Sequence, residues 1–432
     1  MKVAALTWEF PPVITGGLGM ACYGIVKALL KYQTHVDLIM PTKQPAFFAL
    51  KNPEDADTLP VTFIQTTEHK AQHLLLSKSD LQKLIGNPIS AYYTIDKSSS
   101  ISHSLEELKK LDPNPFEKLF NILSDKYHLF RKVRHYTESA VQIAASSDFD
   151  IIHAHDWLTY PAGMILKKIT GKPLVAHVHA TEFDRAGGPG DGRIHNIEYM
   201  GMKYADSVIT VSDYTANIVA HKYNISRDKI TVIHNAYSIA PVDNNRRIFK
   251  EPVVLFMGRI TLQKGPDYFL EVARKVLQRE KKVRFLMAGS GDMEKHILHK
   301  AASLGLGTRL LFAGFLERHE VQKALSATDI FILPSVSEPF GIAPLEAMSH
   351  GAIAIISKNA GVAEVIENAY KIDFWDTDKM ANTIVELIRD PKKVKEVAEK
   401  SKQEVQKLQW ENTVQKLTDL FCQLKQTQIC ST

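Results

Sequence analysis

Cysteine is scarce in this sequence. Only Cys22, Cys422 and Cys430 occur among 432 residues, and they form neither a disulfide framework nor the close spacing of a metal motif. An odd, sparse set of cysteines is typical of reduced thiols in the cytoplasm. The sequence therefore excludes a small disulfide-stabilised scaffold, and we expect a cytoplasmic protein.

Long apolar runs and a strong charge of one sign are also missing. No run approaches the ~20 residues of a membrane-spanning helix. The N-terminal stretch, MKVAALTWEFPP, has about half the apolar length of a signal peptide, so we expect a first β-strand there. A net charge of +5 suits an anionic small substrate but is too weak to indicate nucleic-acid binding.

The apolar segments that the chain does contain are short and regularly spaced. Runs such as VAALTW, DIIHAH, PVVLFMGR and AIAIIS alternate with segments of helical spacing, the longest at residues 116–146. Many runs are apolar on both faces, which is typical of parallel strands covered by helices on each side. Because the chain is too long for one core, we predict an α/β fold with two doubly wound, Rossmann-like domains.

Two breaks in this pattern set the expected domain boundaries. A polar segment near residues 239–251 predicts a linker between a first domain at residues 1–242 and a second at residues 248–408. An irregular stretch at about residues 41–115, rich in Pro, Ser and Lys, is expected to be an insertion in the first domain, with one strand at residues 61–66.

A glycine-rich loop follows the first strand, in TWEFPPVITGGLG, where Gly16 and Gly17 open a helix. In open α/β sheets, ligands bind beyond the carboxyl ends of strands, where helix N-termini offer free N–H groups. These glycines predict either a diphosphate cradle or a tight strand–helix turn, and the sequence leaves both open. Cys22 stands where the dinucleotide fingerprint has Gly or Ala, which disfavours an oxidoreductase.

Two cations follow the first strand of the second domain, in LFMGRITLQKG. Arg259 and Lys264 lie five residues apart in a glycine-containing loop, where they are placed to neutralise a diphosphate leaving group. Solvated surface charges are the alternative, although the flanking glycines favour binding. A third glycine turn, MAGSGD, places Gly289 where a nucleotide base or ribose would contact it.

The segment SEPFGIAPLEA carries two glutamates. Glu338 lies in the loop after a strand, and Glu346 lies eight residues later inside a helix, so the two carboxylates could accept hydrogen bonds from sugar and ribose hydroxyls. The amides of Phe340, Gly341 and Ile342 at the helix start would face a phosphate or sugar oxygen. The alternative is an ordinary acid near a helix N-terminus and a second acid on a solvated face.

Histidine pairs occur at residues 153–155 (HAH) and 177–179 (HVH). Each pair lies on one face of a strand, as a metal site would require. No carboxylate or cysteine spacing accompanies them, so no metal site is predicted. The DFD at residues 148–150 precedes its strand, and the DAD at residues 55–57 lies in the insertion, so surface turns are preferred for both.

The order of these motifs resembles a known family. GGLG near the N-terminus, HAHDW at residues 153–157, GRITLQKG at 258–265 and EPFGIAPLE at 338–346 are similar to motifs of retaining GT-B glycosyltransferases. The likeness is to glycosyltransferase family 4, and within it to glycogen and starch synthases, over nearly the whole chain. It implies an interdomain cleft for a nucleotide-sugar and a helix at residues 409–426 that crosses back to the first domain.

The resemblance also implies roles for individual residues. Four catalytic residues would surround the diphosphate and sugar of the donor: Arg259, Lys264, Glu338 and His179. The two cations would hold the diphosphate and assist its departure. Glu346 would bind the ribose hydroxyls, and Asp156 would lie near the acceptor.

The expected activity is a retaining, metal-independent hexosyl transfer that needs no cofactor. The chain would move a glucosyl unit from ADP- or UDP-glucose to the non-reducing end of an α-1,4-glucan. A family 4 transferase with another sugar or acceptor, such as in cell-surface glycan synthesis, and a non-catalytic nucleotide-sugar-binding protein are the alternatives. Starch synthases carry a lysine before TGGL, where this chain has Ile14, so the choice between ADP and UDP stays open.

Overall fold

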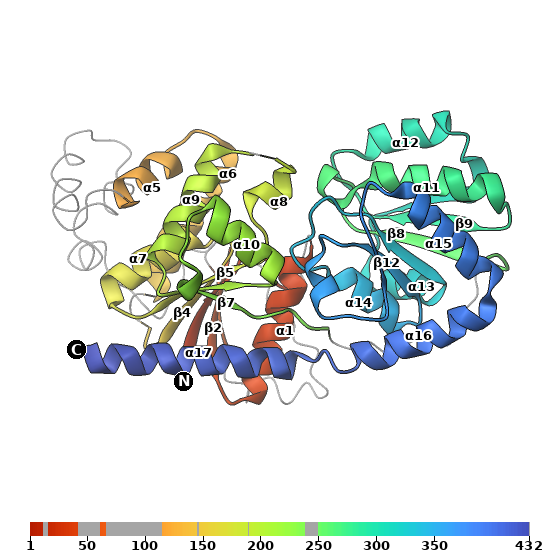
Figure 1. The fold of residues 1–432 in the computed structure, drawn as a ribbon. Helices are drawn as coiled ribbons and strands as arrows, with labels where there is room; N and C mark the ends of the chain where they lie inside the picture. The colour runs from red at the N-terminus through yellow and green to blue at the C-terminus, as the bar shows by residue number, and fades with distance from the viewer. Residues whose placement is uncertain are drawn as a thin grey trace.

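Two α/β domains lie side by side in the computed structural model (Figure 1). The structure describes residues 1–11, 16–41, 61–65, 115–144, 147–188, 190–237 and 249–431. Ile14, most of the 41–115 stretch and most of the expected linker at residues 239–251 lie outside these ranges.

The first domain is built on a parallel sheet with the strand order β3-β2-β1-β4-β5-β6-β7. Its strands are β1 (Lys2–Leu6), β2 (His35–Met40), β3 (Val61–Gln65), β4 (Ile151–His155), β5 (Leu174–Val178), β6 (Ser207–Thr210) and β7 (Ile230–Val232). Its helices are α1 (Gly17–Lys31), α5 (Pro115–Leu123), α6 (His128–Ala144), α7 (Tyr160–Thr170), α8 (Glu182–Ala186), α9 (Gly192–Tyr204), α10 (Asp213–Lys222) and the 3-10 helix η2 (Arg227–Lys229).

The second domain repeats this plan with the strand order β10-β9-β8-β11-β12-β13. Its strands are β8 (Val253–Met257), β9 (Arg284–Ala288), β10 (Leu310–Gly314), β11 (Ile330–Leu333), β12 (Ile353–Ser357) and β13 (Tyr370–Ile372). Its helices are η3 (Leu262–Lys264), α11 (Pro266–Arg279), α12 (Glu294–Ser303), η4 (Gly307–Arg309), α13 (Arg318–Ser326), α14 (Ile342–Ser349), η5 (Gly361–Glu364), α15 (Thr377–Arg389) and α16 (Pro391–Val405). A last helix, α17 (Trp410–Ser431), follows.

The first strand of each domain lies in the middle of its sheet. In the first domain β1 pairs in parallel with both β2 and β4, and in the second β8 pairs with both β9 and β11. The chain therefore winds outward in two directions from each central pair, which confirms the predicted doubly wound fold. A ligand site is expected beyond the carboxyl ends of β1 and β4, and of β8 and β11.

Side chains alternate between the two faces of the first sheet, as the pleat requires. Val3 and Ala5 pack in one core with residues of α1 and α17, whereas Ala4 and Leu6 pack in a second core with residues of α6 and α7. Both faces of the sheet are thus buried at β1, which explains why Val3 to Leu6 are all apolar.

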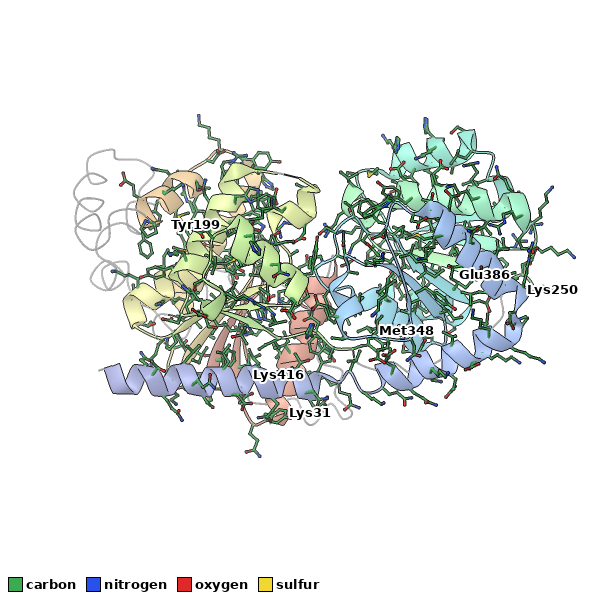
Figure 2. All side chains as sticks on the ribbon, in the orientation of Figure 1. Lys31, Tyr199, Lys250, Met348, Glu386 and Lys416 are labelled. Carbon is green, nitrogen blue, oxygen red and sulfur yellow. The ribbon has the colours of Figure 1, made fainter. Side chains whose placement is uncertain are left out.

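Helix α17 runs from the second domain along the first, with Lys416 on the segment that crosses the first sheet (Figures 1 and 2). Phe421 of α17 is fully buried in the core shared with α1, and Lys425 pairs with Asp150 at 2.9 Å. None of the helices in the described ranges combines the length and the apolarity that crossing a bilayer needs.

Two sequence-based expectations differ from the structure. The helix expected over residues 116–146 is interrupted between α5 and α6, where Tyr127 N donates to Asp125 Oδ1 (2.8 Å) and Ser124 Oγ donates to Phe120 O (2.8 Å). These short polar side chains bond the local backbone in competition with the helix. The three-residue strand β13 was not expected, whereas the strand expected at residues 61–66 is β3.

Docking of α17 depends on a glycine in α1. A Cβ added at Gly24 would lie 2.1 Å from Trp410 Cε2, so Gly24→Ala is expected to lower the free energy of unfolding by about 1–3 kcal/mol through overpacking. In a Trp410→Ala background, the same change should raise stability by up to about 1 kcal/mol, because alanine favours the helix. Urea denaturation of all four proteins measures both effects. Equal effects in the two backgrounds would contradict this contact.

Candidate functional site

Three loops meet at the carboxyl ends of the second sheet, and glycines allow their close approach. Gly265 follows β8 with a φ of +67°, and a Cβ there would lie 2.0 Å from Pro334 O, directly after β11. Gly289 follows β9 with a φ of +131°, and its Cβ would lie 1.9 Å from Gly258 O. The sequence predicts that Gly289 contacts a nucleotide. The close contact with Gly258 O already requires glycine at this position, so the nucleotide contact stays a prediction.

An ion pair joins two of these loops. Lys264 Nζ, after β8, lies 2.5 Å from Glu338 Oε2, after β11, and both side chains are largely buried. Ser335 Oγ donates to the same carboxylate oxygen at 3.3 Å. The positive φ of Gly341, +98°, turns the chain so that a Cβ there would lie only 3.1 Å from Glu338 Cγ. The switch point of the second sheet is the place between β8 and β11 where the direction of winding changes. A paired cation and acid, Lys264 and Glu338, lie there.

Arg259 lies in the loop after β8 that also carries Lys264. Its side chain is exposed, and Nη2 donates to Gln263 Oε1 at 3.0 Å. Gln263 is buried, and its backbone carbonyl accepts a hydrogen bond from Val336 N at 2.9 Å. This bond connects the Arg259 loop to the Glu338 loop. The guanidinium is therefore held by a fixed neighbour but stays accessible to an anion.

Helix α14 begins at Ile342, and no side chain caps its first turn. Gly341 is the N-cap residue, and the side chain of Ile342 packs against the cores of both domains. The ring of Phe340 is buried, so a ligand would meet its backbone rather than its ring. Glu346 lies half-buried in the second turn of α14.

In the first domain, Gly16 and Gly17 lie exposed at the start of α1, after β1. Gly16 has extended backbone (φ −172°), and a Cβ on either glycine would have no neighbour within 4 Å. Neither strain nor crowding in the described structure requires glycine here. The choice between a diphosphate cradle and a tight strand–helix turn therefore stays a prediction.

Asp156 and His179 lie together at the carboxyl ends of β4 and β5. Asp156 adopts a left-handed backbone (φ +60°), and its Oδ1 accepts from His179 N at 2.7 Å and from Ala180 N at 3.3 Å. Burial raises the pKa of Asp156 to about 7. Asp156 thus fixes the backbone that presents His179.

The loops that carry Lys264 and Glu338 meet the segment after His179 across the domain interface. Asp184, in α8, accepts a hydrogen bond of 2.5 Å from Ser337 Oγ, and Ser337 is the neighbour of Glu338. Helix α8 also contacts η3, which carries Lys264. The structure therefore brings Lys264 and Glu338 together and joins their loops to the first-domain segment that begins with His179.

Known proteins match both domains of the chain. The family model described as Glycosyl transferases group 1 matches residues 243–404, and that described as Glycosyltransferase Family 4 matches residues 108–240. The chain is 30% identical to the uncharacterized glycosyltransferase YqgM of Bacillus subtilis, over 65% of this chain and 77% of that relative. The chain is a glycosyltransferase of the GT-B type.

Further relatives extend over almost the full length of this glycosyltransferase. The uncharacterized glycosyltransferase MJ1607 of Methanocaldococcus jannaschii is 28% identical over 98% of both chains. A glycogen synthase of Mycobacterium tuberculosis is 24% identical over 85% of this chain and 80% of the relative. The sucrose-phosphate synthase of Thermosynechococcus elongatus shares the fold, with a TM-score of 0.71 at 19% identity over 98% of both chains.

The first domain of the glycosyltransferase also contains a buried array of four histidines. His153 Nε2 and His177 Nδ1 share a hydrogen bond of 3.1 Å, and His155 Nδ1 and His179 Nε2 share one of 2.9 Å. The register of β4 and β5 pairs His155 with His177, so the two sequence pairs form one cluster. Burial lowers the pKa of all four imidazoles, to about 3 for His153 and His179.

The sequence did not associate Cys22 with these histidines. Ligand atoms of Cys22, His155 and His179 lie within 4.8 Å of one another, as do those of His153, His155 and His177. Thr7 Oγ1 donates to Cys22 Sγ at 3.2 Å, and burial raises the pKa of the thiol above its ordinary value. The absence of a metal requirement therefore stays a prediction.

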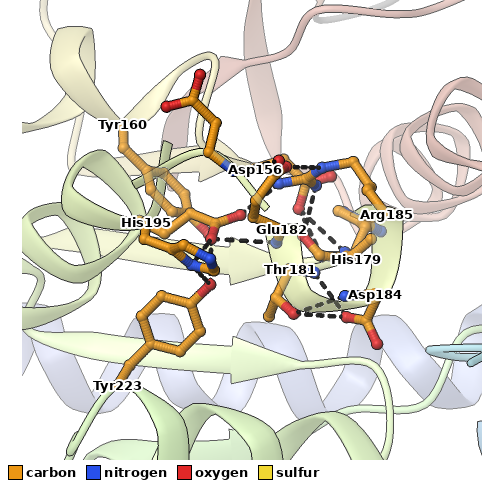
Figure 3. Close-up of polar contacts among 12 residues, drawn as sticks. Asp156, Tyr160, His179, Thr181, Glu182, Asp184, Arg185, His195 and Tyr223 are labelled. Atoms are coloured by element: carbon orange, nitrogen blue, oxygen red, sulfur yellow. Dashed lines mark hydrogen bonds and ion pairs between the residues drawn. The ribbon is translucent and has the colours of Figure 1, made fainter. Parts of the chain in front are cut away.

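A polar network beside His179 was not predicted from the sequence (Figure 3). Arg185 donates to Ala180 O at 2.8 Å and pairs with Glu182 (3.2 Å) and with buried Glu198. Thr181 and Asp184 form a capping box at the start of α8. That Thr-x-x-Asp spacing is a local signal that sequence reading could have used.

The histidine array should make stability depend on pH. A base whose pKa is lowered in the folded state binds fewer protons there than when unfolded, so stability falls as pH drops below about 6.5, by up to ~1.4 kcal/mol per pH unit for each histidine. His153→Phe should reduce the slope by about the contribution of one such histidine. Urea denaturation between pH 5 and pH 8 measures the slopes. An unchanged slope in His153→Phe would refute this assignment.

Proposed function

We propose that this glycosyltransferase moves a glucosyl unit from ADP- or UDP-glucose to the non-reducing end of an α-1,4-glucan, with retention of anomeric configuration. The observation that carries the proposal is the Lys264–Glu338 pair at the switch point of the second sheet. The similarity to a glycogen synthase over 85% of the chain supports the glucan as acceptor.

The cations provide the main catalytic effect in this proposal. As the bond to the anomeric carbon breaks, negative charge grows on the departing diphosphate. Arg259 and Lys264 interact with that charge more strongly in the transition state than in the ground state, which is the condition for faster turnover. Because these two side chains supply positive charge, the reaction needs no metal ion.

Retention is assigned to a front-face reaction. A double displacement would need a carboxylate free to attack the anomeric carbon. Glu338 is engaged by Lys264 and Ser335, and Asp156 is engaged by two backbone amides. The leaving phosphate itself then accepts the proton of the acceptor hydroxyl.

In this proposal the remaining site residues contact the donor and the acceptor. Glu346 accepts hydrogen bonds from the ribose hydroxyls, and the amides of Gly16 and Gly17 approach the diphosphate. His179 and Glu338 contact the transferred sugar from opposite domains. Asp156 lies on the acceptor side.

A transferase with another acceptor is the second candidate. The fold is shared with a sucrose-phosphate synthase, whose name indicates a different acceptor from a glucan. A non-catalytic nucleotide-sugar-binding protein is the third candidate, and the intact Arg259, Lys264 and Glu338 disfavour it.

Release of nucleotide separates these candidates. The protein is incubated with ADP-glucose or UDP-glucose, with and without glycogen, in excess EDTA, and the nucleoside diphosphate is quantified. We expect release that requires glycogen and new α-linkages detected by proton NMR. Release independent of glycogen would report transfer of the glucosyl unit to water and would contradict the glucan proposal. No release with either donor would favour another acceptor or the non-catalytic candidate. Activity that disappears in EDTA and returns with added zinc or magnesium would overturn metal independence.

Lys264→Ala tests the role of the cation. Removing one group that stabilises transition-state charge is expected to lower kcat on the order of 10²- to 10³-fold, with a modest change in donor affinity. Lys281→Ala, which changes an exposed lysine of the second domain, is the control and should be active. Steady-state kinetics and calorimetric titration with the nucleotide measure the two effects. Unchanged turnover in Lys264→Ala would remove its assigned role.

A further inference from the structure

Glu338 lies in the second domain, but the first domain holds the residues on either side of it. Ser337 Oγ donates to Asp184 Oδ1 at 2.5 Å and accepts from Tyr214 OH at 3.0 Å. On the other side, Ser212 Oγ donates to Pro339 O at 2.6 Å. Ser337, Asp184 and Ser212 are all buried, so these bonds are shielded from water.

The fit around these bonds is tight. A Cβ added at Gly361 would lie 2.1 Å from Pro339 O and 2.6 Å from Ser212 Cβ. Gly361 N also donates to Glu338 O at 2.9 Å. The Glu338 segment therefore lies between η5 of its own domain and the start of α10 of the first domain, with no room for a side chain at Gly361.

Glu364 of η5 continues the same interface. Its carboxylate accepts from Asp213 N (2.9 Å) and Tyr214 N (2.8 Å) at the N-terminus of α10, and from His234 at 2.7 Å. A carboxylate at a helix N-terminus is stabilised by the free amides and the helix dipole. Although burial alone would raise it, the hydrogen bonds from His234 and both amides hold the pKa of Glu364 below its ordinary value. A second-domain acid thus caps a first-domain helix.

We propose that Ser337, Pro339 and Glu364, with their first-domain partners Asp184, Ser212, Asp213 and Tyr214, form an interdomain latch that positions Glu338 beside Lys264. The inference rests on the proposed function, because it gives Glu338 a role in transfer. These latch residues are positioning residues: they fix the loop that carries the acid, and they hold it only while the two domains are together.

The structure explains why such a latch would affect turnover more than donor affinity. The Lys264–Glu338 pair depends on the loop of residues 335–341, which the latch holds at Ser337 and Pro339. Misplacing a reacting group by about 1 Å can cost on the order of 100-fold in rate. Arg259, in contrast, bonds Gln263 within the second domain, so its contact with the diphosphate depends on the latch only indirectly, through the bond from Val336 N to Gln263 O.

The chain provides matched controls inside the second domain. Glu404 accepts from Glu367 N (2.5 Å) and Asn368 N (2.9 Å), as Glu364 accepts from two amides, but both of its partners belong to its own domain. Buried Ser401 donates to Asn368 O at 2.8 Å, again within the domain. Glu404→Gln and Ser401→Ala therefore remove comparable hydrogen bonds without touching the domain interface.

The first readout is kinetic. Glu364→Gln and Ser337→Ala are expected to lower kcat at saturating donor by 10- to 100-fold, with less than a threefold change in KM for the donor. Glu404→Gln and Ser401→Ala should keep kcat within about twofold of the parent, although all four variants lose similar thermal stability. Wild-type kcat in both latch variants would overturn the proposal.

The second readout does not depend on activity. Spin labels are attached at Tyr199→Cys in α9 and Lys295→Cys in α12, which lie in different domains, after Cys422 and Cys430 are replaced by serine. We expect one narrow distance distribution in the parent and in both controls, and broader or longer distances in Glu364→Gln and Ser337→Ala. Unchanged distributions in the latch variants would refute the latch.

The two readouts distinguish the failure of either idea. If the parent protein turns over no nucleotide-sugar, the proposed function fails and the distance distributions alone decide the latch. If the parent is active and the latch variants show both parental kcat and parental distances, the latch fails and the proposed function stands.

Discussion

The ion pair between Lys264 and Glu338 is the interaction on which the rest of the site depends. Its two residues come from loops after β8 and β11, which are adjacent because the sheet winds outward from that strand pair. Gly265 permits the approach, since any side chain there would collide with Pro334 O. Breaking a buried pair by removing one partner costs about 3–5 kcal/mol, so each charge keeps the other in place until an anionic ligand enters.

The first domain completes what the second domain begins. The segments that follow β5 and β6 supply Asp184 in α8, Ser212 at the N-cap of α10 and Tyr214 in α10, and these residues contact the chain on both sides of Glu338. Parallel sheets present all their loops of this kind at one edge, so two such domains that meet edge to edge place loops from both around one ligand. The cation–acid pair and the segment that begins with His179 therefore become one site only in the assembled pair of domains.

Local patterns in the sequence were enough to predict the fold and some residues of the candidate site. Buried parallel strands are mostly apolar, which made the strands recognisable, and the loops after β8 and β11 carried recognisable cations and acids. Both histidine pairs were identified in the sequence, but their assembly into one array depends on the register that pairs His155 with His177, and register leaves no mark in a single strand. The bond from Ser337 to Asp184 links residues 153 positions apart, so no local signal predicts it, whereas the Thr181–Asp184 capping box had one.

Most charges of the described residues at the candidate site are paired or suppressed by burial. Buried histidines stay uncharged at neutral pH because their pKa values are lowered, and burial raises the pKa of Asp156 to about 7. Arg185 is balanced by Glu182 and Glu198. Among the described residues of the candidate site, Arg259 has an exposed side chain, whereas Lys264 is paired with Glu338 and lies largely buried. An anionic ligand that enters the site would therefore meet Arg259 first and would have to compete with Glu338 for Lys264.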